Sequence, residues 1–320
     1  MRFLLTDEQR AFAASLDAML AAADAPAAAR AWAAGDLAPG RALWARLAEA
    51  GLFALAADEA YGGVGLLPVE LAVGFVELGR HAVPGPVVET AAAAVLLGGA
   101  GGAGAGRLIP GLVRGGTVAT LALSGAGRFA LDADAADLVL AESAGTLRLA
   151  PGHTGPVRVS SDPVRRLAEP AEGGEVLATG VDPTDAALLA RLLTAAQSLG
   201  VGLALLDRTV AYVTQRVQFG VPVGSFQAVK HRIADTLVGL EFARPLVYGA
   251  AVTLDGRDVA AAKVATGEAV YAAAGAALQL HGAVGYTDEL DLALWLRKAR
   301  PLRGAWGTPS ACRELVRTSG

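Results

Sequence analysis

Apolar residues recur with the helical period of 3.6 over most of the first hundred positions. Near the start, Phe12, Leu16 and Leu20 are spaced four residues apart. They follow Thr6 and Gln9, whose spacing is that of a capping box at the beginning of a helix. The same period returns in three later stretches and predicts three further helices, over about 40–50, 68–79 and 88–98.

The pattern changes after the first hundred residues. Residues 100–106 are nearly all glycine and alanine, which predicts a linker or loop. Four short stretches then show the pattern of strands, with apolar runs or alternation of apolar and polar positions: 117–123, 138–141, 146–149 and 157–159. They predict a small β domain with room for roughly five or six strands.

Long helices return in the final third. Asp182-Pro183-Thr184-Asp185 places a cap, a proline and an acid in the order typical of a helix start. The periodic stretches that follow have short connections, which favour antiparallel packing, and cover about 182–216, 225–254, 258–281 and 288–299. We therefore predict a mainly helical α+β protein with three parts: an N-terminal helical domain over 1–106, an abbreviated β domain over 107–180 and a C-terminal antiparallel four-helix bundle over 181–320.

Composition narrows the class of protein. Aromatic residues make up only 5% of the 320 positions, and alanine dominates the 53% that are hydrophobic, so the helices should pack closely through small side chains. The net charge is -4 without a basic stripe, which argues against a nucleic-acid partner. Cys312 is the single cysteine, so an internal disulfide and a multi-cysteine metal site are excluded, and we predict no metal.

No segment predicts insertion into a membrane. The charge-free run 90–106 is too short and too rich in glycine to span a bilayer. The chain opens on 1–5 and runs directly into charged residues, which is not the pattern of a secretory signal. We expect a soluble, cytoplasmic protein.

The turn between the first two long helices concentrates candidate chemistry. Glycine and proline break the helical period there, so the side chains on both sides of the turn should face one corner. Arg216 offers planar donors for phosphate, Phe219 offers a stacking face, and the amides of Gln218 and Gln227 offer donors and acceptors. This set suits a flat aromatic ring that carries phosphates; the alternative is a plain helix–turn–helix corner with a solvated arginine.

The order of the three parts and five local patterns resemble the acyl-CoA dehydrogenase family over most of the chain. The patterns are Leu5–Gln9, Tyr61–Gly65, Arg216–Gln227 with Ala234-Asp235 after it, Gln279–Tyr286 and Arg297–Arg300. The resemblance implies a flavoprotein oxidoreductase of fatty acid or steroid catabolism. Such an enzyme desaturates an acyl-CoA thioester between its α and β carbons with FAD and passes electrons to an electron-transfer flavoprotein.

The resemblance also implies that FAD is held across a subunit interface. In the family one subunit encloses the flavin ring, and the bundle of its neighbour clasps the adenine and the pyrophosphate. Arg216 would neutralise the pyrophosphate, Phe219 would pack on the cofactor, and Gln279 would hydrogen-bond it. His281 departs from the family, in which glycine is common at this position. The cofactor-binding residues carried over are Arg216, Gln218, Phe219, Gln227, Gln279, Gly282, Ala283 and Thr308.

The catalytic carboxylate of the family has no counterpart at either known position. Most members place a glutamate before a Gly-Thr pair; here Trp306 precedes Gly307-Thr308, and tryptophan has no basic group. Other members place the base on the first bundle helix beside an arginine, which resembles Arg191 here, and its neighbour is Ala190. A carboxylate must lie close to the α-proton to act as the base, so we predict no catalytic residue in this chain.

The predicted β domain also departs from the family's pattern. The loop that lines the flavin in the family resembles Leu121–Gly127, after which the chain moves directly to 137–140. The family's tryptophan strand has no counterpart, since no tryptophan occurs between Trp44 and Trp295. The residues that would bind a neighbour's FAD are therefore present, and the part of the site that would bind this chain's own flavin ring is reduced.

This selective loss predicts a subunit of a hetero-oligomeric acyl-CoA dehydrogenase, similar to the shortened subunit of bacterial enzymes of the sterol-degradation type. It would lend FAD-binding residues to a partner subunit, and activity of the chain alone is not expected. Two alternatives remain open. One is a self-sufficient homo-oligomeric enzyme with a displaced base, for which the candidates are Glu241, Glu268 and Asp288. The other is a scaffold that binds acyl-CoA or a partner without turnover.

Overall fold

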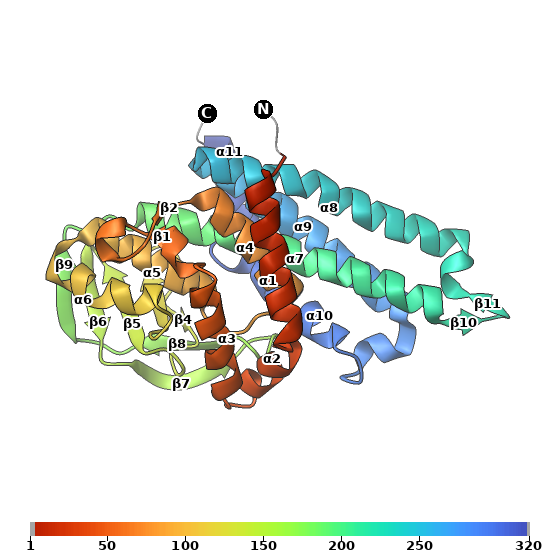
Figure 1. Ribbon diagram of the computed structural model, residues 1–320, viewed down its shortest axis with the longest axis horizontal. Helices are drawn as coiled ribbons and strands as arrows, with labels where there is room; N and C mark the ends of the chain where they lie inside the picture. Colours follow the sequence, from red (N-terminus) through yellow and green to blue (C-terminus); the bar gives the residue numbers. More distant parts are fainter. Residues whose placement is uncertain (1–3, 319–320) are drawn as a thin grey trace.

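The computed structural model describes residues 4–318. Helices from the N-terminal part and a set of strands occupy one side of the molecule, and three long helices extend from them to a hairpin at the opposite end (Figure 1). The predicted class, mainly helical with a small β part and a C-terminal helical bundle, is confirmed. Residues 1–3, part of the stretch in which no secretory signal is expected, lie outside the described residues.

The N-terminal part begins as its caps predict. The hydroxyl of Thr6 accepts from the Gln9 amide at 3.2 Å, and the Gln9 side chain accepts from the Thr6 amide at 2.9 Å, so the capping box is confirmed. The helices are α1 (Asp7–Ala22), α2 (Ala25–Ala33), α3 (Ala38–Glu49), α4 (Pro68–Arg80), α5 (Val87–Ala100) and α6 (Gly102–Val113). The short pair β1 (Ala56–Ala57) and β2 (Gly65–Leu66) flanks the glycine-rich loop.

The linker predicted for residues 100–106 is wrong, because α6 already begins at Gly102. Ala105, Ile109 and Leu112 bury one face of this helix against the core. Packing of such a face supplies most of a helix's stability and here outweighs the poor helix propensity of glycine. The break between α5 and α6 is confined to Gly101, at a φ of 65°.

The β part consists of two small sheets. The first has the order β3-β5-β6-β9, with β3 parallel to β5 and the other neighbours antiparallel; the second is antiparallel with the order β4-β8-β7. These seven strands exceed the predicted five or six, because the two-residue β4 has no periodicity to detect. Their bounds are β3 (Ala119–Leu123), β4 (Ala130–Leu131), β5 (Leu138–Ser143), β6 (Thr146–Ala150), β7 (His153–Val159), β8 (Arg166–Pro170) and β9 (Glu175–Thr179).

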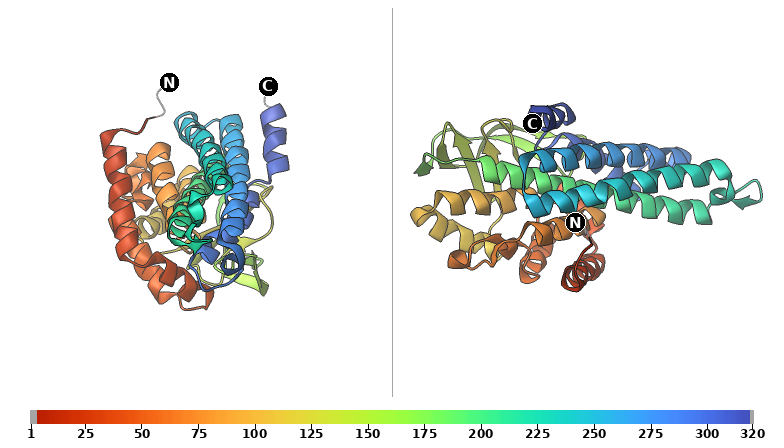
Figure 2. Two further views of the ribbon diagram at one scale, coloured as in Figure 1. Left: turned by 90° about the vertical axis from the view of Figure 1, so that its right-hand side faces the viewer. Right: turned by 90° about the horizontal axis from the view of Figure 1, so that it is seen from above.

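The C-terminal part is organised by three long helices that run side by side (Figure 2). By length and composition α7 could span a membrane, but 89% of its most apolar window is buried inside the protein, as expected of a central core helix. The helices are α7 (Thr184–Gln215), α8 (Gln227–Thr253), α9 (Gly256–His281), α10 (Leu292–Gly304) and α11 (Pro309–Thr318). The hairpin of β10 (Val217–Gln218) and β11 (Val221–Pro222) joins α7 to α8.

The predicted packing through small side chains is confirmed where α4 crosses α7. A Cβ atom added at Gly79 would lie 2.0 Å from the backbone oxygen of Gln197. A Cβ atom added at Gly200 would lie 1.9 Å from the backbone oxygen of Val76. Both separations are impossible for real atoms, so only glycine permits this crossing and the position of the N-terminal helices against the bundle.

Glu77 of α4 provides a pH-dependent term in stability. Burial raises its pKa to about 7, despite the opposing charge of Arg80. The folded state therefore retains the proton when the unfolded state has lost it, and stability falls as pH rises from about 4.5 to 7. Glu77→Gln should remove about 2–3 kcal/mol of this loss. Urea unfolding at pH 5 and pH 8 measures it, with Glu314→Gln as an exposed control; identical pH dependence in Glu77→Gln and wild type would contradict the prediction.

Candidate functional site

Side chains with candidate chemistry gather at two places, the hairpin end of the bundle and a cavity at its other end. At the hairpin, Arg216 caps α7, with its amide bonded to the Tyr212 oxygen. Phe219 lies at the tip with a φ of 55°, and its side chain is 91% exposed. Its ring packs edge to face against the ring of Phe226, with 6.3 Å between the ring centroids. The rings of Phe219 and Phe226 therefore face each other across the turn; that Arg216 and Gln227 share this corner stays a prediction.

The turn that ends α9 lies at the same end of the bundle. Tyr212 of α7 stacks on His281 with 4.2 Å between ring centroids and 23° between planes. The ring of His281 also contacts the Ala277 oxygen through Nδ1 at 2.8 Å, and burial lowers its pKa, which favours the neutral ring near pH 7. His281 thus anchors the helix end, and exposed Gln279 faces a shallow depression shared with the start of α8.

The groups at this end fit the cofactor that the resemblance implies. Within residues 4–318, the guanidinium of Arg216 and the amides of Gln227 and Gln279 form no hydrogen bond or ion pair, so they are free to bind phosphate and ring atoms. Gln218 donates to the neighbouring Val217 oxygen at 2.9 Å. Thr308 does not join this group, because it precedes α11 and its hydroxyl accepts from the Ala311 amide at 3.2 Å. Gly282 and Ala283 lie exposed at the end of α9.

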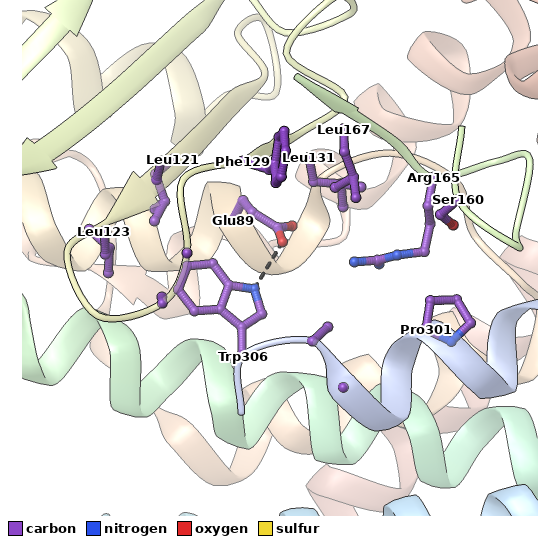
Figure 3. A pocket seen from close by; sticks show the side chains of 15 residues that line it. Glu89, Leu121, Leu123, Phe129, Leu131, Ser160, Arg165, Leu167, Pro301 and Trp306 are labelled. Carbon is purple, nitrogen blue, oxygen red and sulfur yellow. Dashed lines mark hydrogen bonds between the residues drawn. The ribbon is translucent and has the colours of Figure 1, made fainter. Parts of the chain in front are cut away.

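The second place is a cavity of about 290 Å³ between α5, the β strands and the end of α10 (Figure 3). Trp306 enters it with a φ of 56°, and its indole nitrogen donates to Oε1 of Glu89 at 2.9 Å. The other polar side chains at the cavity are those of Arg165 and Ser160, and the remaining wall is largely apolar. We call this space the central cavity; its larger apolar side chains are Leu121, Leu123, Phe129, Leu131, Leu167 and Pro301.

Glu89 is a buried carboxyl group that sequence reasoning missed. Its side chain is 3% exposed, and burial raises its pKa, opposed by the charge of Arg165 and the hydrogen bond from Trp306. Oε2 has no hydrogen-bond partner within the described residues. The sequence contains one signal that could have identified it, because Glu89 is the only charged residue of the largely apolar helix α5. A carboxyl group on such a helix becomes buried whichever face the helix presents.

The structure brings together the two segments in which the resemblance places the family's base. Arg191 of α7 donates from Nε to the Trp306 oxygen at 3.0 Å, and its neighbour Ala190 is fully buried. Neither position carries a carboxylate. The three alternative bases lie outside the central cavity and pair with arginines, Glu241 with Arg244, Glu268 with Arg303 and Asp288 with Arg297.

Comparison with known proteins identifies the family. The acyl-CoA dehydrogenase N-terminal domain matches residues 6–115, and the C-terminal domain of the same family matches residues 184–319. A relative named acyl-CoA dehydrogenase IpdE2 from Mycobacterium tuberculosis is 34% identical over 97% of this chain and 96% of its own length.

Two solved structures share the whole fold. The Tcur3481-Tcur3483 steroid ACAD variant superposes with a TM-score of 0.84 at 24% identity, over 97% of both chains. The ChsE4-ChsE5 complex from Mycobacterium tuberculosis superposes with a TM-score of 0.81 at 24% identity, over 99% of this chain and 98% of that chain. The chain therefore belongs to the acyl-CoA dehydrogenase family of FAD-dependent oxidoreductases.

Proposed function

We propose that the chain is the non-catalytic subunit of a hetero-oligomeric acyl-CoA dehydrogenase and lends FAD-binding residues to its partner's site. The observation that carries this proposal is the contrast between the two ends of the bundle. At the hairpin end, the side chains of Arg216, Gln227 and Gln279 form no hydrogen bond or ion pair within residues 4–318, and Phe219 projects into solvent. At the cavity end, Trp306 occupies the position of the base and is bonded to Glu89.

The surface of α8 supports a partner subunit. Leu237, Val238, Phe242, Leu246 and Val252 are all exposed on this helix, although its other face is buried in the bundle. A contiguous exposed apolar surface marks an interaction site in a soluble protein. The partner we propose is a second acyl-CoA dehydrogenase-like subunit that carries the missing base.

The relatives agree with this assignment. IpdE2 is named as an acyl-CoA dehydrogenase, and the superposed structures are described as a steroid enzyme with a two-part name and as a complex of two differently named chains. The substrate in our proposal is accordingly an acyl-CoA thioester from fatty acid or steroid catabolism. FAD, when bound, would supply the oxidant for this desaturation, and an electron-transfer flavoprotein would take up the electrons. Cytoplasmic location is part of the same proposal.

A second candidate function is a self-sufficient enzyme in which Glu89 is the base. The observation that favours it is the unpartnered Oε2 of Glu89 inside the central cavity. Flavin stoichiometry separates the two candidates. We expect the chain co-expressed with its partner to contain one FAD per pair of subunits and the chain alone to lack dehydrogenase activity. A full complement of one FAD per chain with turnover of an acyl-CoA by the isolated chain would overturn the shared-site proposal.

Arg216→Ala should weaken FAD retention in the complex by about 1.5–3 kcal/mol, because a charged hydrogen bond to the pyrophosphate is lost. Flavin content after dilution, read from absorbance, and a fluorescence titration with FAD measure the effect. Arg114→Ala is the matched control, since Arg114 is exposed and lies after α6, away from the bundle. Unchanged flavin content in Arg216→Ala would remove this arginine from the site.

A further inference from the structure

Three side chains that can ligate a metal meet where α1 packs on α4 (Figure 1). Glu77 lies in the last turn of α4 and His81 follows the helix, with its amide bonded to the Glu77 oxygen at 3.1 Å. Asp17 faces them from α1, with its Oδ1 2.7 Å from Nε2 of His81. One ligand atom from each residue lies within 4.8 Å of the other two, and no other such group occurs among the described residues.

Packed helices hold these side chains in place. α1 is also joined to α4 at the start of their contact, where the amide of Gln9 donates to Oε1 of Glu70 at 2.9 Å. α4 is fixed against α7 by the glycine crossing at Gly79, two residues after Glu77. Sites on helices are more precise than sites on loops. Rotation of the side chains alone can bring the ligand atoms to the separation of about 3–3.5 Å that a tetrahedral ion requires.

The carboxylate of Glu77 lacks the partners that its burial calls for. Its side chain is only 14% exposed, and it accepts no hydrogen bond within residues 4–318. Arg80 approaches it with Nε at 3.5 Å, but the same guanidinium is bonded to Asp207 at 3.0 Å. Arg244 of α8, the other arginine whose charge acts on Glu77, pairs with Glu241 at 2.6 Å. Buried charges of this kind are paired or coordinate metals, so a cation that binds the carboxylate directly is favoured.

The types of ligand determine which cation fits. Two carboxylates supply two negative charges, and the imidazole supplies a nitrogen. Mg²⁺ and Ca²⁺ prefer a shell of six or more oxygen ligands, whereas imidazole suits zinc and its neighbours in the transition series. Zinc binds histidine nitrogen together with carboxylate oxygen, usually with four ligands in a tetrahedron. Three protein ligands would therefore leave one position for water.

We propose that Asp17, Glu77 and His81 bind one Zn²⁺ ion, which joins α1 to α4. Because α1 packs chiefly on α4, a bridge at this point fixes the first helix of the chain to the rest of the molecule. The proposal departs from the expectation of no metal, which rested on the single cysteine, since histidine and carboxylates can replace thiolates as zinc ligands. It goes beyond the shared cofactor and does not depend on it.

The test uses the co-expressed complex without an affinity tag, stripped with EDTA and dialysed at pH 8, above the pKa of about 7 that burial gives Glu77. Isothermal titration calorimetry with ZnCl₂ should show a saturable site with one ion per copy of this chain, and MgCl₂ should show none. Hydrogen exchange in α1 should slow when zinc is added, whereas exchange in the hairpin of β10 and β11 should stay unchanged. Absence of a stoichiometric zinc site, or equal binding of Mg²⁺, overturns the proposal.

Variants assign the ion to the cluster. Asp17→Asn, Glu77→Gln and His81→Gln should each weaken zinc binding at least about tenfold, because a neutral amide replaces one of three ligands. Glu77→Gln is expected to be no less stable than wild type at pH 8 without zinc, so its loss of binding would not come from unfolding. His231→Gln is the matched control, since His231 is exposed on α8 and outside the cluster. Unchanged zinc affinity in Glu77→Gln, or an equal loss in His231→Gln, places the ion elsewhere and overturns the site.

Discussion

Replacing Lys298 with methionine is expected to lower the free energy of unfolding by about 3–5 kcal/mol. Lys298 of α10 and Asp162, in the loop between β7 and β8, form an ion pair at 2.9 Å, and their side chains are only 3% and 1% exposed. Methionine fills a similar volume but leaves the Asp162 carboxylate buried without its counter-charge. The pair fixes the β strands to the bundle, so its loss should also alter the central cavity between them.

A double-mutant cycle isolates the charge effect. Asp162 also accepts from the Val164 amide through Oδ1 at 3.1 Å, and asparagine can keep that bond. Lys298→Met combined with Asp162→Asn should therefore be more stable than Lys298→Met alone, because no unpaired charge remains. Arg317→Met breaks an exposed pair with Glu314 and should change stability by less than about 0.5 kcal/mol. Equal losses in Lys298→Met and Arg317→Met, measured by urea unfolding, would contradict the argument.

The long helices could be predicted because each carries its own signal. The helix predicted over 258–281 is followed directly by Gly282, and α9 does end at His281. The capping box at Thr6 and Gln9 is equally local. α6 could not be predicted, because its glycines have poor helix propensity and its stability comes from Ile109 and Leu112 packing on the core.

Part of the candidate site could likewise be predicted from the sequence, and part could not. The residues of the hairpin lie within twelve positions of each other, so sequence spacing already places them in one corner. The Glu89–Trp306 hydrogen bond joins residues 217 positions apart. No local pattern indicates that the carboxyl group of Glu89 on α5 meets the indole of Trp306, the position at which the resemblance places the family's base. Such contacts depend on the packing of α5, the sheets and α10, which periodicity does not determine.

Phe242→Asp should weaken association with the partner subunit by about 2–4 kcal/mol, which corresponds to a dissociation constant roughly 30- to 1,000-fold larger. The side chain of Phe242 is 74% exposed in the chain, and Val238 and Leu246 lie one helical turn to either side of it. Large aromatic residues at the centre of such a surface supply most of the binding energy of an interface. Aspartate would bring an unpaired charge into the same place. Size-exclusion chromatography with light scattering, over a dilution series of the co-expressed complex, measures the shift.

Stability of the isolated chain separates a lost interface from a damaged fold. Phe242 makes little contact within its own chain, so its replacement should change the free energy of unfolding by less than about 0.5 kcal/mol. Val159→Asp is the matched control, because Val159 of β7 is 64% exposed and lies outside the surface of α8. If Phe242→Asp and Val159→Asp leave the complex equally intact, α8 is not the interface. Dissociation accompanied by loss of FAD in Phe242→Asp alone would connect the interface to the cofactor, since a site built from two subunits cannot survive their separation.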